Sequence, residues 1–220
     1  AKAIDWHKAP TNALDSSKPP FHRWFPDGEM NTCHNAVDRH VAAGRGEEKA
    51  IIYDSPITGN ASTMTYAELQ DATARFAGML QKLGVSSGDR VIIYMPMIPE
   101  AVVAMLGCAR LGAVHSVVFG GFAAAELAKR INDATPKAII SASCGHEPNR
   151  IVSYKPLLDE AIELSRHKPD HCVVYQREAL QADMVEGRDL EWHAAHEGVE
   201  PLAPVPVKAT DPLYKLYPSG

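Results

Sequence analysis

The amino-acid sequence predicts an α/β fold: a doubly wound, mostly parallel sheet with helices on both faces, preceded by an irregular, aromatic-rich N-terminal arm. Past residue 90, short apolar runs alternate with segments of helical periodicity, which favours parallel strands joined by helices. Over residues 1–30, four prolines interrupt any period. The same stretch carries two Trp and two Phe, which is unusual for a disordered tail. We therefore expect an arm whose aromatic side chains pack against a larger body.

The elements before residue 90 are predicted from local signals. A short helix is expected near residues 35–43, ended by Gly44, and residues 49–54 predict a strand followed by a turn at 56–60. Thr65 and Glu68 have the spacing of a capping box, so a longer helix should begin there and end before Gly84. Its apolar residues recur at helical spacing and would form one buried face: Leu69, Ala72, Phe76, Ala77, Leu80 and Leu83.

The regular part of the pattern follows. Strands are predicted at residues 90–95, 113–119, 137–141 and 171–175, and helices at 99–111, 124–134 and 156–165. A loop of about ten residues is expected between the third of these strands and the last helix. Residues 176–211 lose the pattern and predict a surface excursion that docks in part through Glu191 and Trp192. A last strand is expected at residues 212–217.

The composition is that of an ordinary globular protein. Of the 220 residues, 45% are hydrophobic and 22% are charged. The net charge of −5 gives no electrostatic reason to expect binding to nucleic acid or to an anionic membrane. No apolar run approaches the roughly 18 residues of a membrane helix. The four cysteines suit reduced thiols, and the first ten residues lack the apolar centre of a secretory signal. We expect a cytoplasmic protein, or one of the mitochondrial matrix if a transit peptide has been removed.

Three loops follow strands at the same edge of the predicted sheet. They are Phe119-Gly120-Gly121-Phe122, residues 141–150, and Pro218-Ser219-Gly220. In an open parallel sheet, ligands bind outside the carboxyl ends of the strands, so the three loops could meet at one site.

Two interpretations remain open for each of the first two loops. Gly120 and Gly121 either form a tight strand-to-helix turn or let the backbone approach an anionic ligand. They are not a dinucleotide fingerprint, because Phe122 and Ala125 occupy positions that would have to be glycine. Arg150 either binds a phosphate group or is a solvated side chain paired with Glu147.

No complete catalytic motif is present in the sequence. Cys144 and His146 lie too close along one loop to meet as nucleophile and base. Two histidine pairs have spacings that metal sites sometimes use, but no further ligands are near them in sequence: His167 with His171, and His193 with His196. The chain also lacks a G-x-S-x-G elbow and a Walker loop. No catalytic residue and no metal ligand is predicted.

Four strings together resemble the acyl-adenylate-forming enzymes, in particular the short-chain acyl-CoA synthetases that act on acetate and propionate. The resemblance covers essentially all 220 residues, and the strings that carry it are WFPDGEMNTCHNAVDRHV (24–41), GDRVIIYMPMIPEAVVAMLGCARLGAVHSVVFGGF (88–122), ISASCGHEPNRIVSYKPLLDEAIELS (140–165) and DPLYKLYPSG (211–220). The third string is more similar to the propionate-CoA ligase type than to the acetate type. The resemblance implies an arm over residues 1–48 and the first part of the large domain over residues 49–220.

The resemblance also implies a reaction and its ligands. Members activate a small carboxylate with ATP, in the presence of Mg²⁺, and transfer the acyl group to coenzyme A. By this resemblance, Phe119, Gly120 and Gly121 match the loop where the coenzyme A nucleotide packs, and Arg150 matches a residue that contacts its phosphates. Glu147, Pro148 and Asn149 complete the second loop, and Glu147 is better suited to orient Arg150 than to contact phosphate. Ser219 and Gly220 match the start of the ATP phosphate loop.

Three residues depart from the family pattern. His146 stands where an aliphatic residue is usual, Lys215 replaces an aliphatic residue in a strand expected to be buried, and Pro218 replaces the Thr that opens the phosphate loop. The Lys of that loop, the Mg²⁺ ligand and the acyl pocket would lie after Gly220. We therefore expect these 220 residues alone not to catalyse the ligase reaction. Alternatives are an acetyl-CoA synthetase, another acyl-adenylate-forming ligase, or a non-catalytic binding fragment.

Overall fold

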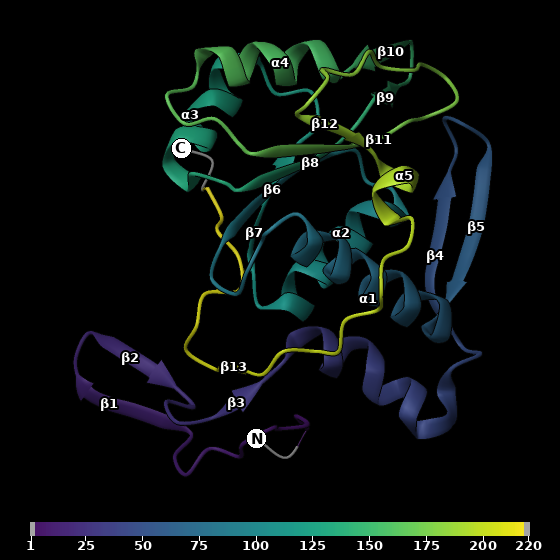
Figure 1. Cartoon of the computed structure of the whole chain (residues 1–220). Coiled ribbons are helices and arrows are strands. Elements are labelled where there is room, and N and C mark those ends of the chain that lie inside the picture. Colours follow the sequence, from purple (N-terminus) through teal and green to yellow (C-terminus); the bar gives the residue numbers. More distant parts are fainter. Residues whose placement is uncertain (1–2, 218–220) are drawn as a thin grey trace.

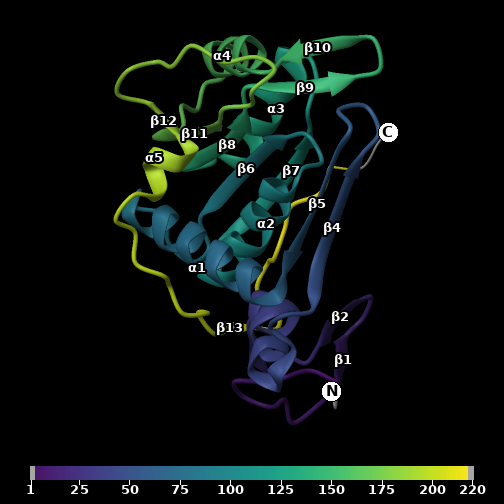
Figure 2. The same ribbon diagram turned by 90° about the vertical axis from the view of Figure 1, so that its right-hand side faces the viewer.

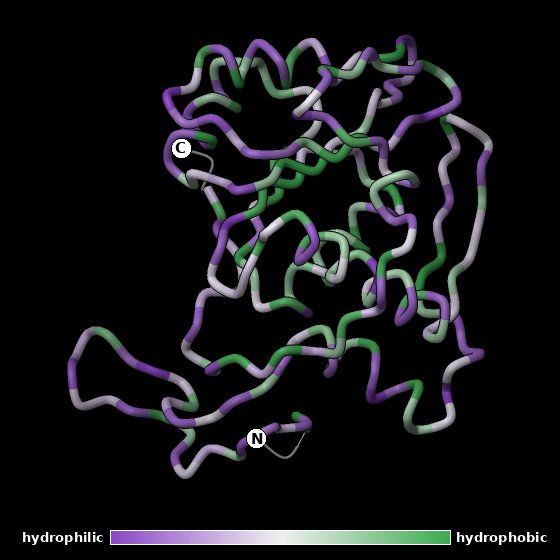
Figure 3. The backbone as a smooth tube through the Cα atoms, in the orientation of Figure 1, coloured by the Kyte–Doolittle hydropathy of each residue, from purple (hydrophilic) through white to green (hydrophobic). Residues whose placement is uncertain are grey.

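A five-stranded parallel sheet forms the centre of the computed structural model, which describes residues 3–217 (Figure 1). Its strands lie in the order β12-β11-β8-β6-β7, and every neighbouring pair is parallel. Their bounds are β6 (Arg90–Met95), β7 (Val114–Phe119), β8 (Ala138–Ala142), β11 (His171–Tyr175) and β12 (Asp189–Glu191). The predicted fold class is confirmed, and the apolar centres of these strands lie together in the middle of the molecule (Figure 3).

Helices cover both faces of the sheet because successive strands of the sequence are added in opposite directions. The chain passes from β6 to β7 on one side and then crosses back to β8 on the other side of β6. One face carries α1 (Tyr66–Lys82), α2 (Pro99–Leu111) and α5 (Trp192–His196), and the other carries α3 (Ala124–Ala134) and α4 (Lys155–Leu164) (Figures 1 and 2). Strand β6 serves both cores: Val91 and Ile93 face the first, and Ile92 and Tyr94 face the second.

Helix α1 begins as its sequence predicts. The Thr65 hydroxyl accepts a hydrogen bond from the backbone N–H of Glu68 at 3.2 Å, and the Glu68 carboxylate accepts one from the N–H of Thr65 at 2.7 Å. Gly84 follows the helix with a φ of 79°. Most of the expected apolar face is buried, and its Phe76 packs against Trp192 at 5.2 Å between ring centroids. The expected docking of the 176–211 excursion through Trp192 is thereby confirmed.

Several short strands were not predicted. Strand β4 (Lys49–Ser55) does not join the parallel sheet, since it pairs with β5 (Asn60–Thr65) in a separate antiparallel hairpin. The prediction of an irregular loop at residues 141–150 is wrong. This stretch contains β9 (Cys144–Glu147), which pairs with β10 (Arg150–Ser153). Arg150 therefore begins a strand and does not directly precede a helix. The excursion at 176–211 contributes β12 to the edge of the sheet.

The N-terminal arm contains more regular structure than its prolines suggest. Strands β1 (Leu14–Lys18) and β2 (Phe21–Trp24) form a hairpin that extends away from the sheet (Figure 1), and β3 (Glu29–Met30) pairs with β13 (Val207–Lys208). The helix expected at 35–43 is present as part of a longer helical segment with two π-helical turns, η1 (His34–Asp38) and η2 (Val41–Arg45). Gly44 lies inside the second turn with a φ of 80°.

Polar side chains, more than rings, attach this arm to the body. Phe21 and Trp24 are largely exposed, which contradicts their expected packing role. Instead, Asn31 donates hydrogen bonds to the carbonyls of Ala109 at 2.9 Å and Val205 at 2.8 Å. Arg110 of α2 forms a two-pronged ion pair with Asp38 at 2.8 and 2.9 Å, and its Nε donates to the Leu202 carbonyl at 2.6 Å. We call Asn31, Asp38 and Arg110 the arm clamp.

The strand expected at 212–217 is reduced to a single bridge beside β7. Tyr214 lies opposite His115, and the N–H of Lys215 donates to the His115 carbonyl at 2.9 Å. Lys215 is not buried as expected, because its ammonium group reaches Asp133 near the surface, so the anticipated desolvation cost is avoided. Pro218, Ser219 and Gly220 lie outside the described residues. Within residues 3–217, no helix has the length and apolar character needed to cross a membrane.

Candidate functional site

The first candidate loop is a tight turn that presents an aromatic ring. Strand β7 ends at Phe119, whose side chain is 71% exposed. The N–H of Phe122 donates to the Phe119 carbonyl at 3.3 Å, and the two rings meet edge to face at 6.0 Å between centroids. Gly121 adopts a φ of 105°, a conformation that side chains other than hydrogen disfavour. Gly120 and Gly121 therefore form a tight turn beside an exposed Phe119 ring, whereas a backbone approach to an anionic ligand stays a prediction.

A buried tyrosine holds this turn in place. The hydroxyl of Tyr94, on β6, accepts a hydrogen bond from the N–H of Gly121 at 3.2 Å and donates one to the carbonyl of Phe122 at 3.1 Å. The N–H of Gly121 is thus already used. Gly120 lies against a second tyrosine, Tyr154, because a Cβ atom added to Gly120 would come within 2.4 Å of that ring.

The second candidate loop is the tip of the β9–β10 hairpin, which projects from the body in Figure 2. Glu147 and Arg150 face each other across the turn formed by Pro148 and Asn149. The Nε of Arg150 donates to the Glu147 carboxylate at 2.7 Å, with side-chain exposures of 71% and 48%. This hydrogen bond lowers the pKa of Glu147 and raises that of Arg150. The expected pairing of the two residues is confirmed, whereas a phosphate contact stays a prediction.

Cys144 and His146 precede this tip on β9. Cys144 is fully buried, which does not suit a nucleophile. The Nδ1 atom of His146 is buried without a hydrogen-bond partner in the described part of the chain. Burial, followed by the charge of Arg177, lowers the pKa of His146, so its imidazole is neutral at physiological pH.

The two loops approach each other at the ring of Tyr154. Gly120 touches one part of this ring, and Gly145 of β9 touches another, because a Cβ on Gly145 would lie 2.1 Å from the Tyr154 hydroxyl oxygen. The structure thus brings together two of the three predicted loops, while Ser219 and Gly220 of the third lie outside the described residues. Across residues 3–217, no three His, Cys, Asp or Glu side chains are grouped as a metal ion would need.

Tyr94 and Tyr154 were not recognised from the sequence. A usable signal was present for Tyr94, which is the one hydroxyl-bearing residue in the otherwise apolar centre of the strand RVIIYM. A buried tyrosine usually needs a partner for its hydroxyl, and the nearest candidates are backbone groups at the end of the next strand. Tyr154 follows a strand that was not predicted, so its position relative to Gly120 could not be inferred.

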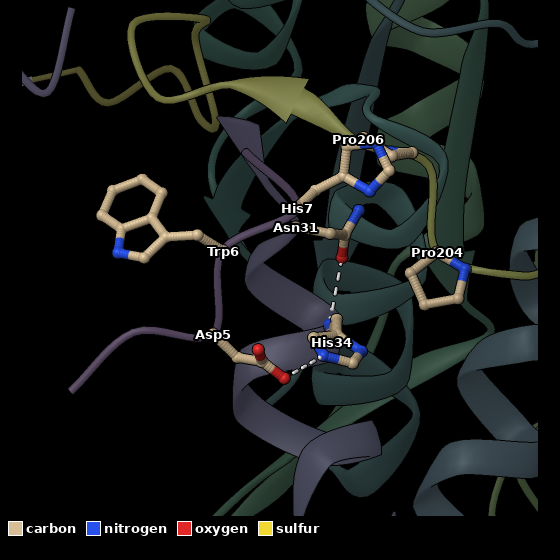
Figure 4. Close-up of a pocket in the computed structure, with 7 residues that line it drawn as sticks. All are labelled: Asp5, Trp6, His7, Asn31, His34, Pro204 and Pro206. Atoms are coloured by element: carbon tan, nitrogen blue, oxygen red, sulfur yellow. Dashed lines mark hydrogen bonds and ion pairs between the residues drawn. The ribbon is translucent and has the colours of Figure 1, made fainter. Parts of the chain in front are cut away.

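A hollow lies elsewhere, where the arm meets residues 204–206 (Figure 4). It has a volume of about 270 Å³ and is lined by Asp5, Trp6, His7, Asn31, His34, Pro204 and Pro206. Its polar groups already bond one another: the Nε2 of His34 lies 2.8 Å from the Asp5 carboxylate, and the N–H of His34 donates to Asn31 at 3.1 Å. These contacts stabilise the arm.

Comparisons with known proteins agree with the sequence resemblance. A family model described as AMP-binding enzyme matches residues 38–220, and one described as Acetyl-coenzyme A synthetase N-terminus matches residues 1–36. The chain is 54% identical to an uncharacterized protein of Pseudomonas aeruginosa, covering 100% of the chain and 35% of the relative. It is 47% identical to human acyl-CoA synthetase short-chain family member 3, mitochondrial, covering 100% and 32% respectively. It is 45% identical to an acetyl-coenzyme A synthetase of Streptomyces avermitilis, covering 100% and 34%.

A solved structure shares the fold. Acetoacetyl-CoA synthetase from Streptomyces lividans matches with a TM-score of 0.87 and 25% identity, over 99% of this chain and 32% of that one. The chain therefore spans about a third of the length of the curated relatives it matches. Because one family model covers most of its residues, the chain belongs to the AMP-binding enzyme family.

Proposed function

We propose that the chain is the N-terminal portion of an ATP-dependent, AMP-forming ligase that joins a short-chain carboxylic acid, preferably propionate, to coenzyme A. One observation carries this proposal: an exposed aromatic ring, Phe119, and an exposed guanidinium, Arg150, are presented by two loops that meet at Tyr154. The family match and the names of the relatives support the reaction class. The division into an arm, residues 1–48, and a first part of the large domain, residues 49–220, belongs to the same proposal.

The proposed reaction has two steps. A carboxylate oxygen of the acid attacks the α-phosphorus of ATP, so that pyrophosphate leaves and an acyl-adenylate forms. The sulfur of coenzyme A then attacks the acyl carbon, its proton is lost, and AMP leaves. Mg²⁺ would neutralise charge on the phosphates of ATP. We assign the ATP contacts of this stretch to Ser219 and Gly220, and all other ATP and Mg²⁺ contacts to residues beyond these 220.

The residues described here serve the second step. The Phe119 ring stacks on the adenine of coenzyme A, while Gly120 and Gly121 keep the adjoining backbone free of side chains that would block it. Arg150 binds a phosphate group of coenzyme A. Glu147 orients its guanidinium through the 2.7 Å contact, and Pro148 and Asn149 form the turn that sets their spacing.

Titration of coenzyme A against the full-length protein tests the assignment of Arg150. We expect Arg150→Ala to weaken binding about tenfold or more, because a charge-assisted contact to phosphate is lost. Arg45→Ala is a matched control, since Arg45 forms an exposed pair with Glu48 at the same spacing and at 2.7 Å. Equal affinities of wild type and Arg150→Ala would remove Arg150 from the site.

Acetate is the second candidate substrate. The acetyl-coenzyme A synthetase of Streptomyces avermitilis is 45% identical to this chain, close to the 47% of the human short-chain relative, and the arm matches a model named for acetyl-coenzyme A synthetase. Comparing kcat/KM of the full-length protein for acetate, propionate, butyrate and benzoate separates these cases. A higher value for propionate supports the proposal, a higher value for acetate replaces it, and a preference for benzoate indicates another branch of the family.

The isolated 220-residue polypeptide should not release pyrophosphate from ATP and propionate. The rest of the phosphate loop and its Lys are not among these residues. Pyrophosphate release by this polypeptide would contradict the assignment of ATP binding to other parts of the relatives' length. We expect the enzyme in the cytoplasm, or in the mitochondrial matrix, a location that the names of several relatives include.

A further inference from the structure

Two buried tyrosines connect the proposed coenzyme A loops to the sheet. Tyr94 is fully buried on β6, and its hydroxyl bonds both the N–H of Gly121 and the carbonyl of Phe122. One side chain therefore satisfies a donor and an acceptor in the turn that carries Phe119.

Tyr154 makes a second connection, by shape rather than by hydrogen bonding. Its ring lies so close to Gly120 and to Gly145 that neither position has room for a Cβ atom. The ring also packs against that of Tyr94 at 5.2 Å between centroids. The rigid Tyr154 ring thus lies between the two loops, contacts both of them directly and fixes the distance between them.

The position of Tyr154 is itself fixed from behind. Its N–H donates to the Ser143 carbonyl, at the end of β8, at 3.0 Å. The next residue, Lys155, is 3% exposed and pairs with Asp159 at 2.6 Å and with Asp189 of β12 at 2.8 Å. Lys155 and Arg188 together compensate the two carboxylates, so moving the buried lysine would disrupt this network of ion pairs. Tyr154 is therefore anchored to two strands of the sheet and to helix α4.

We propose that Tyr94 and Tyr154 are positioning residues for coenzyme A, which keep Phe119 and Arg150 at the separation that one nucleotide requires. This inference rests on the proposed function of Phe119 and Arg150 as coenzyme A contacts. Neither tyrosine touches the reacting atoms in this scheme. Tyr94 sets the orientation of the Phe119 turn, and Tyr154 sets its distance from the base of the hairpin that carries Arg150.

The two-step reaction distinguishes a positioning role from a merely structural one, because only the second step uses coenzyme A. Acyl-adenylate formation needs no coenzyme A. Its rate is measured by the exchange of labelled pyrophosphate into ATP. If the tyrosines position coenzyme A alone, their loss should raise KM for coenzyme A and leave this exchange nearly unchanged. General destabilisation would affect both steps together.

The test uses four variants of the full-length protein. Tyr154→Leu fills part of the space but loses the plane, and we expect KM for coenzyme A to rise about tenfold, with pyrophosphate exchange within about twofold of wild type. Tyr154→Phe keeps the ring and should restore KM. Tyr94→Phe removes the bridging hydroxyl and should raise KM at least about threefold. Phe76→Leu, a buried aromatic in the other core, should lower Tm without raising KM for coenzyme A.

Each outcome supports or overturns the inference. An unchanged KM for coenzyme A in Tyr154→Leu, or an equal loss of both steps, overturns it. Where Tyr154→Leu does not fold, the nearly isosteric Tyr94→Phe decides, since an unchanged KM in that variant contradicts the role of its hydroxyl. Failure of the proposed function is distinguishable: the wild-type protein would then form no acyl-CoA, or Arg150→Ala would bind coenzyme A as tightly as wild type.

Discussion

The arm clamp and the tip of the β9–β10 hairpin use the same two charged groups in opposite surroundings. In the clamp, the side chains of Arg110 and Asp38 are 5% and 10% exposed, whereas those of Arg150 and Glu147 at the tip are 71% and 48% exposed. A buried pair cannot lose one member without leaving a desolvated charge. An exposed pair contributes little to stability and can exchange its partner for a ligand. Geometry alone therefore does not reveal which arginine is available for binding.

The largest effect should come from breaking the buried pair. Asp38→Ala leaves the Arg110 guanidinium without its carboxylate, although the Leu202 carbonyl still accepts from its Nε. We expect the free energy of unfolding to fall by about 3–5 kcal/mol, measured by urea denaturation. Glu48→Ala, which removes the carboxylate from the exposed Arg45, should leave the urea midpoint unchanged. Similar midpoints for the two variants would contradict the distinction between the clamp and exposed pairs.

A smaller loss is expected from crowding the contact between the two coenzyme A loops. Gly120→Ala places a Cβ within 2.4 Å of the Tyr154 ring, which is backed by helix α4. Overpacking of this kind should lower the free energy of unfolding by about 1–3 kcal/mol. In a Tyr154→Leu background the same substitution should cost clearly less, because the residues are in contact. Additive costs of the two substitutions, measured in a double-mutant cycle, would show that Gly120 and Tyr154 do not interact.

The buried cluster of Asp189, Arg188 and Lys155 should make the stability of the protein depend on pH. Burial on its own would raise the pKa of Asp189, but hydrogen bonds from Arg188 and Lys155 outweigh it, so the pKa lies below its ordinary value of 3.8. A carboxylate with a lowered pKa in the folded state stabilises the protein above its unfolded pKa, and this contribution is lost as pH falls below that value. The stability difference between wild type and Asp189→Asn should therefore shrink from about pH 5 to about pH 2. If this stability difference instead grew as the pH fell, the pKa of Asp189 would be raised in the folded protein and not lowered.

The smallest effect on stability is expected at the exposed tip. Arg150→Ala and Glu147→Gln should leave the urea midpoint of unfolding unchanged, because both side chains are well solvated. Their effect should be confined to coenzyme A affinity, with Arg150→Ala the more severe. A clear loss of stability in either variant would place this pair with the buried clusters and argue against its availability to a ligand.

The regular elements could be predicted because their signals are local. The bounds of β6, α2, α3 and β11 follow from apolar runs and from glycine and proline at their ends. The capping box at Thr65 and Glu68 is satisfied within four residues of sequence. In such cases the sequence pattern and the tertiary structure require the same conformation.

The missed elements depend on contacts that are distant in sequence. Strand β12 is only Asp-Leu-Glu, and Asp189 is tolerated in the sheet because Lys155 and Arg188 compensate its charge. Strand β9, Cys-Gly-His-Glu, contains no β-branched residue, and Gly145 is needed there by the Tyr154 ring. At the site, residue types indicated Phe119 and Arg150, but the tyrosines that hold their loops required knowledge of how β6, β7 and β9 lie together.

The burial of all four cysteines makes each region of the molecule separately observable by chemical labelling. Cys33 contacts Arg110 in the arm clamp, Cys144 lies on β9 beside Gly145, and both thiols are inaccessible in the folded state. A thiol reagent can therefore modify them only after local or global opening. The labelling rate of Cys33 reports release of the arm, and that of Cys144 reports opening of the hairpin base. The native sequence thus contains a probe for each side of the comparison, and no cysteine has to be introduced.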